Sequence, residues 1–280
     1  MGLDVLGLIA GCGRFPLDVA RTARNRGRSV VAIAFHGQTD PSIEAAATNV
    51  TWLHLGQVDH AVRSLLAAGV KDAVMAGKIP KLTMFDARQK LELDEHATRL
   101  IGSLPDRKDD SILRLVADHL ESQGIRLLGQ AELVPELVAG AGPLGATQPT
   151  ASVAADIEFG WPIAKAVAGL DIGQTVVVRD RAVLAVEAID GTDAAIERAG
   201  KLAARACVVK VAKPHQDPRF DLPAIGLRTI EALLAARASA LAIEAGSTVV
   251  LDRKELVELA DANEIALIGI ESVADTGSTP

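Results

Sequence analysis

Aromatic side chains are scarce in this 280-residue sequence, which contains five Phe, two Trp and no Tyr. Proteins that bind single-stranded nucleic acid stack the bases on aromatic rings, so this scarcity argues against that role. An excess of basic charge is also lacking, because 36 acidic residues outnumber 29 basic ones and give a formal charge of −7. A basic face is what binds a phosphate backbone. The composition therefore predicts no nucleic-acid partner.

Cysteines and long apolar runs are equally few. Cys12 and Cys207 are the two cysteines, and without metal-site spacing they indicate reduced thiols in a cytoplasmic protein. No apolar stretch approaches the roughly 18–20 residues that a membrane-spanning helix needs. The N-terminal residues lack the basic region and cleavage site of a signal peptide. We therefore expect a cytoplasmic protein for which any membrane contact is peripheral.

Alternating strand and helix patterns are present, and they divide the chain into two halves. In the first half, short runs rich in Val and Ile alternate with amphipathic stretches, which is typical of βαβ units and a parallel sheet. The stretch 135–152 is rich in Gly, Ala, Pro and Thr without periodicity, which predicts a linker. Beyond it, the β-rich runs 175–179 and 182–187 predict a hairpin. We predict an α/β fold with an N-terminal Rossmann-like parallel-sheet domain (1–134) and a C-terminal mixed-sheet α/β catalytic domain (153–280).

A glycine-rich loop follows the first predicted strand and precedes a helix. Its glycines are Gly11 and Gly13, and backbone amides at such a helix start suit a phosphate. A dinucleotide site would need a third glycine where the sequence has Pro16. It would also need an acidic residue at the end of the second strand, where the nearest carboxylate is Asp40. A tight turn, a dinucleotide site and a site for another phosphate or sugar ligand remain as alternatives.

Two more polar groups occur in the first half. Gly77 and Lys78 come directly after the fourth predicted strand, and the carboxyl ends of parallel strands meet in one crevice. They can therefore face the same cleft as the first loop, and an exposed, solvated lysine is the alternative. Asp109 and Asp110 precede a helix, where they either cap it or serve a phosphate or metal.

An acidic loop follows the predicted hairpin in the second half. Glu187 ends the hairpin, and Asp190, Gly191, Thr192 and Asp193 open the next helix. Backbone donors combined with carboxylates suit a phosphate held through a divalent metal. The alternative is a helix cap.

The densest polar cluster is Lys210–Gly226, which leaves a predicted strand, contains the segment KPHQDPRFDLPAIG (Lys213–Gly226) and enters a helix. Lys213 and Arg219 can neutralise phosphate oxygens, and Asp217 and Asp221 can hold Mg²⁺ or activate water. Its three prolines stiffen the segment. Polar loops on a rigid scaffold often carry catalysis, and a solvated connector is the alternative.

Six motifs follow one another along nearly the whole chain: GLIAGxGxxP, AGK, a DD pair, LDIGQ, VEAxxGTD and KPxQDxRFDLPxIG. In this order they resemble the bacterial UDP-2,3-diacylglucosamine pyrophosphatases that are unrelated to calcineurin-like phosphoesterases. The GNH[ED] motif of metallophosphoesterases and the Nudix-type run are both absent.

The resemblance implies hydrolysis of UDP-2,3-diacylglucosamine to UMP and 2,3-diacylglucosamine 1-phosphate (lipid X), with Mg²⁺ as cofactor, in lipid A biosynthesis. It implies that Asp221 is the essential active-site residue, and we predict that Asp221 binds Mg²⁺ or orients the water. Glu187, Asp190 and Asp193 are candidate further metal ligands. The candidate substrate-binding residues are Gly11, Gly13, Gly77, Lys78, Asp109, Asp110, Gln174, Gly191, Thr192, Lys213, Pro214 and Gly226. Peripheral contact with the cytoplasmic face of the inner membrane and a homodimer are both compatible with this function.

Two alternatives stay open at this point. One is a nucleotide-sugar or NAD(P)-dependent oxidoreductase that uses the N-terminal glycine loop. The other is a lipid- or nucleotide-sugar-binding protein without turnover. The clustered carboxylates count against the second, because a pure anion binder gains nothing from them.

The first prediction concerns Asp221. Asp221→Ala should abolish hydrolysis of the pyrophosphate while the fold survives, because the change removes the carboxylate and little volume. Turnover by a purified, folded variant would contradict the assignment.

Overall fold

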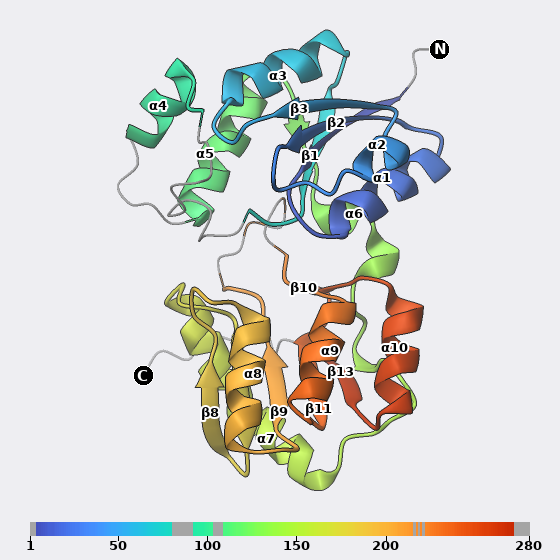
Figure 1. Cartoon of the computed structure of the whole chain (residues 1–280), viewed down its shortest axis with the longest axis vertical. Helices are drawn as coiled ribbons and strands as arrows, with labels where there is room; N and C mark the ends of the chain where they lie inside the picture. Colours follow the sequence, from blue (N-terminus) through green and yellow to red (C-terminus); the bar gives the residue numbers. More distant parts are fainter. Residues whose placement is uncertain are drawn as a thin grey trace. The chain divides into compact units, whose positions relative to one another are not determined.

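The structure is a computed structural model that describes residues 4–79, 92–102, 109–214, 217, 219 and 222–271 (Figure 1). The chain forms two compact units. The first comprises Met1–Pro135 and Asp217–Asp221, and the second comprises Glu136–Gln216 and Leu222–Pro280.

The first unit is built on a five-stranded parallel sheet of order β3-β2-β1-β4-β5. Its elements are β1 (Val5–Ala10), α1 (Phe15–Asn25), β2 (Ser29–Phe35), α2 (Ile43–Ala46), β3 (Asn49–Leu53), α3 (Val58–Ala67), β4 (Asp72–Ala76), α4 (Glu95–Gly102), α5 (Asp109–Ser122), β5 (Arg126–Leu127) and α6 (Gln130–Leu133). This is the strand order of a Rossmann sheet. All five strands are parallel, and the order in which the chain adds strands reverses between β1 and β4. The predicted N-terminal Rossmann-like parallel-sheet domain is confirmed.

Helices cover both faces of this sheet (Figure 1). Ile9 and Ile33 on the central strands pack in one cluster with Leu65 of α3 and Leu120 of α5. Helix α1 contacts β1, β2 and β4 from the other face, and α6 packs against α1 and β4. Strands buried on both faces are nearly continuous apolar runs, which is why polar side chains occur mainly where the strands end.

The second unit contains a six-stranded mixed sheet of order β6-β13-β11-β9-β7-β8 and a separate pair, β10-β12. Its elements are β6 (Gly142–Pro143), α7 (Ala151–Gly169), β7 (Thr175–Arg179), β8 (Ala182–Val186), α8 (Thr192–Leu202), β9 (Cys207–Lys210), β10 (Ala224–Ile225), α9 (Leu227–Ala235), β11 (Ala240–Glu244), β12 (Val249–Val250), α10 (Arg253–Ala262) and β13 (Ala266–Ile270). Strands β9, β11 and β13 are mutually parallel, whereas β6, β7 and β8 each run antiparallel to their neighbours. The predicted mixed-sheet α/β domain is confirmed.

The predicted hairpin is also present, as β7 and β8. Its two turn residues, Asp180 and Arg181, both have left-handed backbones, with φ of 51° and 57°. Such a turn matches the twist of the strands but is unfavourable for residues other than Gly, Asn and Asp. The buried carboxylate of Asp156 accepts hydrogen bonds from both turn amides, at 3.1 and 2.7 Å. These two bonds stabilise the turn without a glycine.

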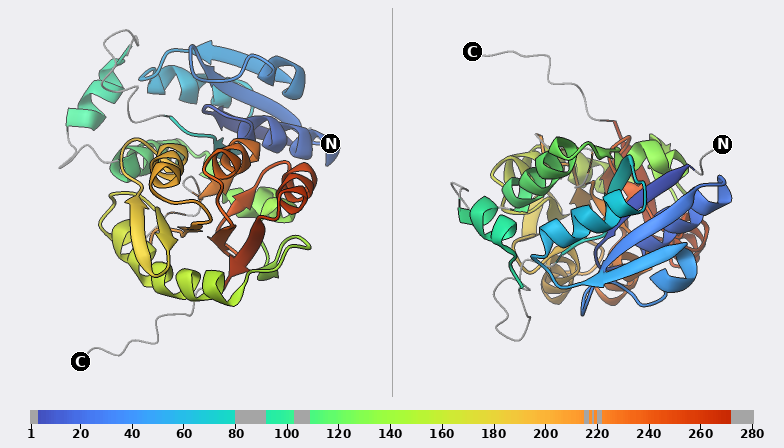
Figure 2. Two further views of the ribbon diagram at one scale, coloured as in Figure 1. Left: turned by 60° about the horizontal axis from the view of Figure 1, so that its bottom comes forward. Right: turned by 90° about the horizontal axis from the view of Figure 1, so that it is seen from above.

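Helix α7 crosses one face of the mixed sheet, and α8, α9 and α10 cover the other (Figure 2). Gly160 of α7 allows the helix to approach closely, since a Cβ there would lie 2.9 Å from Val178 Cγ2 and 3.1 Å from Val209 Cγ2. No described helix is both long enough and apolar enough to cross a membrane.

The stretch 135–152, predicted to be a linker, contains a short 3-10 helix (Pro135–Leu137) and strand β6. The backbone amide of Ala139 donates a hydrogen bond to the Thr248 carbonyl oxygen, and β6 pairs with β13. The Asp261 carboxylate accepts the amides of Ala146 and Thr147, both at 2.8 Å. Much of the stretch is therefore fastened to the second unit through its backbone, which explains why its sequence has no periodicity. Where a linker begins and ends stays a prediction.

The packing of β13 gives a stability prediction. A Cβ on Gly269 would collide with the carbonyl oxygen of Gly140, whereas a Cβ on Gly140 would meet no described atom within 4 Å. Gly269→Ala should lower the free energy of unfolding by about 1–3 kcal/mol in a urea titration. Gly140→Ala is the matched control and should leave it nearly unchanged. Equal stability of the two variants would refute this packing.

Candidate functional site

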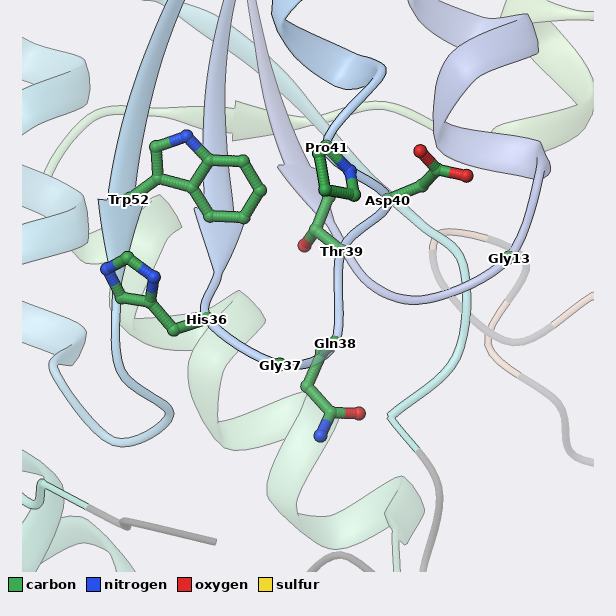
Figure 3. Close-up of a pocket in the computed structure, with 8 residues that line it drawn as sticks. All are labelled: Gly13, His36, Gly37, Gln38, Thr39, Asp40, Pro41 and Trp52. Atoms are coloured by element: carbon green, nitrogen blue, oxygen red, sulfur yellow. The ribbon is translucent and has the colours of Figure 1, made fainter.

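Polar residues gather at the carboxyl ends of parallel strands in each unit, and the two groups are described separately. In the first unit a cavity of about 670 Å³ lies at the ends of β1 and β2, beside the edge strand β3 (Figure 3). It is lined by Gly13, His36, Gly37, Gln38, Thr39, Asp40, Pro41 and Trp52. Gly13, one of the predicted substrate-binding residues, therefore lines a cavity.

The loops after β1 and β4 are hydrogen-bonded to each other. The backbone amide of Gly11 donates to the Ala76 carbonyl oxygen at 2.8 Å, and the backbone amide of Cys12 donates to the Lys78 carbonyl oxygen at 2.7 Å. A Cβ on Gly11 would lie 2.7 Å from the Lys78 carbonyl oxygen. Gly77 has φ of +87°, and a Cβ there would lie 2.6 Å from the Cys12 carbonyl oxygen. The structure thus brings these predicted glycines and Lys78 together, and it explains the glycines by close backbone approach.

Asp109 and Asp110 are the first residues of α5. Their side chains lie outside what the structure describes. Their substrate-binding role stays a prediction.

Asp217 and Arg219, from the polar cluster, belong to the first unit. The Arg219 guanidinium donates to both carboxylate oxygens of Asp217, at 2.7–3.1 Å, and to Glu121 of α5 at 2.7 Å. These hydrogen bonds from Arg219 lower the pKa of Asp217. The two side chains predicted for phosphate and metal binding are therefore engaged with each other, in a bidentate ion pair.

The second unit carries a group that we call the polar edge: Gln174, Thr175, Glu187, Thr192, Lys210 and Glu244. Thr175 begins β7, Glu187 follows β8, and Lys210 and Glu244 end β9 and β11. Register pairs Thr175 with Lys210, and the Glu187 amide donates to Thr175. Neighbouring strands therefore bring these residues to one edge of the sheet.

Lys210 lies at the centre of the polar edge and is only 1% exposed. Its Nζ donates to Thr192 Oγ1 at 2.8 Å and lies 4.0 Å from Glu187 Oε2. Thr192 in turn donates to Glu187 Oε1 at 2.9 Å. A buried ammonium is tolerable only with such partners. This chain of contacts links two predicted site residues, Glu187 and Thr192, through Lys210, to which the sequence analysis assigned no role.

Gln174 and Glu187 lie side by side because Gly173 permits it. A Cβ on Gly173 would collide with the Glu187 carbonyl oxygen. The backbone amide of Gln174 donates to Glu187 Oε2 at 3.3 Å. Gln174 Oε1 is buried and, within the described part of the chain, has no hydrogen-bond donor.

The remaining predicted metal ligands have arginine partners. Asp190 forms an ion pair with Arg198, and Asp193 lies 3.8 Å from Arg228. Gly191, with φ of +87°, is the residue before α8. Among the described residues, no group of three or more His, Cys, Asp or Glu is arranged to hold a metal. Glu187, Asp190 and Asp193 do not form a ready ion site by themselves, and Asp221 lies outside the described residues.

A second ion pair, between the partly exposed Lys165 and the buried Glu244, holds the chain where it leaves β9. Lys165 of α7 donates to both Glu244 oxygens, at 2.6 and 2.8 Å, and to the Ala212 carbonyl at 3.1 Å. Glu244, 5% exposed, also accepts the Ala212 amide at 2.7 Å. Both backbone polar groups of Ala212 are therefore bound, immediately before Lys213. A Lys or Glu at the end of an otherwise apolar strand is the sequence signal that could have found Lys210 and Glu244.

The segment that follows includes three predicted binding residues. Lys213 lies 2.9 Å from Asp171, and Pro214 follows it in a turn. Gly226 precedes α9 and donates its amide to Thr229 Oγ1 at 3.5 Å. Asp221, between them, lies outside the described residues.

Lys210→Met tests the polar edge. It removes the ammonium but keeps the length, so Glu187 loses a buried cationic neighbour, and we expect a loss of about 3 kcal/mol in the free energy of unfolding. Lys201→Met on α8, where the lysine is exposed, is the matched control. Thermal denaturation that does not distinguish the two variants would contradict the described network.

Comparison with known proteins agrees with this two-part architecture. Residues 5–137 match the LpxI N-terminal domain, and residues 140–268 match the LpxI C-terminal domain. The UDP-2,3-diacylglucosamine pyrophosphatase LpxI of Caulobacter vibrioides is 32% identical over 278 residues, which cover 95% of this chain and 97% of that protein. The chain belongs to the LpxI family.

Proposed function

We propose that this chain hydrolyses the pyrophosphate bond of UDP-2,3-diacylglucosamine, yielding UMP and 2,3-diacylglucosamine 1-phosphate (lipid X) for lipid A biosynthesis. The observation that carries the proposal is the end-to-end similarity to a relative with that activity in its name. The ordered motifs of the sequence support the same assignment, since KPHQDPRFDLPAIG contains the aspartate that the family resemblance marks as essential, Asp221.

The segment that follows strand β9, beside the polar edge, supports this chemistry. Hydrolysis of a pyrophosphate increases the charge on phosphate oxygens and requires a water molecule aligned with the breaking bond. Lys213 begins the segment that contains Asp221. The backbone just before it is fixed at Ala212, whose carbonyl accepts from Lys165 and whose amide donates to Glu244. In the proposal Lys213 neutralises a phosphate oxygen, and Asp221 orients the attacking water.

Mg²⁺ is part of the proposal, but the described carboxylates do not form a ligand set for it. Asp190 and Asp193 have arginine partners, and Glu187 is bonded to Thr192. Mg²⁺ usually binds through one or two carboxylates and the substrate's phosphate oxygens. The carboxylate would then have to be one such as Asp221, outside the described residues.

The lipid nature of the substrate also bears on where the protein acts. Leu170, Ile172 and Ile189 are exposed apolar residues, at 71%, 48% and 54%. They belong to the two loops that carry Gln174 and Glu187. Exposed apolar side chains beside a polar site favour contact with acyl chains or a lipid surface. We therefore propose a cytoplasmic enzyme in peripheral contact with the inner membrane, and we leave the homodimer as a proposal from the sequence.

Phosphorus-31 NMR tests the reaction. Purified protein with UDP-2,3-diacylglucosamine and Mg²⁺ should replace the two pyrophosphate signals by two phosphomonoester signals. Chelation of divalent ions should stop the conversion, and added Mg²⁺ should restore it. Conversion that survives chelation would remove Mg²⁺ from the proposal and leave the hydrolysis.

The same sample separates the alternatives. An intact substrate that nevertheless binds would indicate a binding protein. Substrate-dependent oxidation of NAD(P)H, followed by absorbance, would indicate an oxidoreductase. Either result would overturn the proposed hydrolysis.

A further inference from the structure

Arg219 joins the segment Asp217–Asp221 to helix α5 within the first unit. We propose that Arg219 and Glu121 form an anchor that positions this segment for hydrolysis, and that Arg219 does not bind a substrate phosphate; this inference rests on the proposed function. Asp221 follows Arg219 by two residues, and two residues of chain span at most about 7 Å. A displacement of Arg219 is therefore passed on to Asp221.

All three guanidinium nitrogens of Arg219 donate to carboxylates. Nε and Nη2 donate to Asp217 at 2.7–3.1 Å, and Nη1 donates to Glu121 Oε1 at 2.7 Å. The backbone amide of Arg219 also donates to Asp217 Oδ1, at 3.0 Å, which closes a local turn. A substrate phosphate would therefore compete with two carboxylates for this guanidinium. The geometry is that of a positioning residue.

Helix α5 is a firm support for this anchor. Ala117 and Leu120 are buried in the hydrophobic core of the first unit. Arg114 and Glu121 are exposed on the same helix. They are seven residues apart, close to two full turns, so their side chains leave one face of the helix. The face that meets the segment thus belongs to a helix that the core holds in place.

The charges on this face complement those of the segment. Glu121 accepts from Arg219, while the pKa of Asp217 is lowered chiefly by Arg219 and to a smaller extent by the charge of Arg114. Glu121 lies in the last turn of α5, where the helix dipole disfavours a carboxylate. Arg219 supplies the cation that offsets this effect. Two opposite charges on the helix therefore meet two opposite charges on the segment.

The kinetics of Glu121→Gln test the anchor. This variant keeps the side-chain volume and removes the charge that holds Arg219. Because the segment is then less well placed, kcat for UDP-2,3-diacylglucosamine should fall about tenfold with KM nearly unchanged. If Arg219 instead bound a phosphate, loss of a competing carboxylate would lower KM and leave kcat intact. Asp118→Asn, the same charge removal at an exposed site on α5, is the matched control and should behave like the unaltered protein.

Arg219→Lys provides the second variant. Lysine keeps the charge but lacks the planar fork that binds two carboxylates, so kcat should fall by about tenfold or more. Added to Glu121→Gln, it should cause no loss beyond its own, because both changes remove one contact. Multiplied effects in the double variant, or a raised KM with unchanged kcat in Arg219→Lys, would overturn the anchor.

Limited digestion with trypsin measures the anchor without catalysis. Trypsin must bind the arginine side chain in its own pocket before it cuts. The Arg219–Phe220 bond should therefore be cut faster in Glu121→Gln than in Asp118→Asn, as mass spectrometry of the fragments would show. Unchanged rates at the other cleavage sites would exclude general unfolding. Equal cleavage after Arg219 in the two variants would overturn the anchor.

The two assays together separate this inference from the proposed function. Faster cleavage after Arg219 with an unchanged kcat in Glu121→Gln would overturn the positioning role and leave the hydrolysis. No hydrolysis by the unaltered protein would overturn the proposed function, and the digestion would still decide whether Glu121 holds Arg219.

Discussion

The ion pair between Lys165 and the buried Glu244 is the constraint on which the polar edge depends. It joins helix α7 to the end of β11 and binds both backbone polar groups of Ala212. Loss of Lys165 would leave the buried Glu244 carboxylate without its cation, which is strongly destabilising, whereas loss of the Glu244 charge leaves a Lys165 side chain that is 25% exposed to water. Because Ala212 directly precedes the segment that contains Lys213 and Asp221, the pair determines where that segment leaves the sheet.

The two units share one arrangement of strands and polar groups. In each, parallel strands are buried on both faces, and the polar or aromatic groups occur at the carboxyl ends of the strands. In the first unit these ends present rings, glycines and one ionised carboxylate around a cavity. In the second they present the buried Lys210 and the buried Glu244, with hydroxyl and ammonium partners.

Much of the fold could be predicted because it depends on local patterns. Apolar runs and turns predicted both sheets and the β7–β8 hairpin, and the motif glycines mark real close approaches, as at Gly77. Lys165 and Glu244 could not be paired from the sequence, because they are 79 residues apart and each lies inside a regular element. Asp40 was discounted for its distance from the strand end, yet the turn after Phe35 returns it to the cavity. Asp221, identified by its motif, stays a prediction.

The central claim is that the pair between Lys165 and Glu244 positions the catalytic segment. The most direct test compares hydrolysis of UDP-2,3-diacylglucosamine by Glu244→Gln and by Glu255→Gln, the same change at an exposed site on α10. Glu244→Gln keeps the volume and removes the charge, so kcat should fall by about 100-fold with little change in KM, because the catalytic segment is misplaced. Glu255→Gln should match the unaltered enzyme. Equal kcat for two folded variants would contradict the claim.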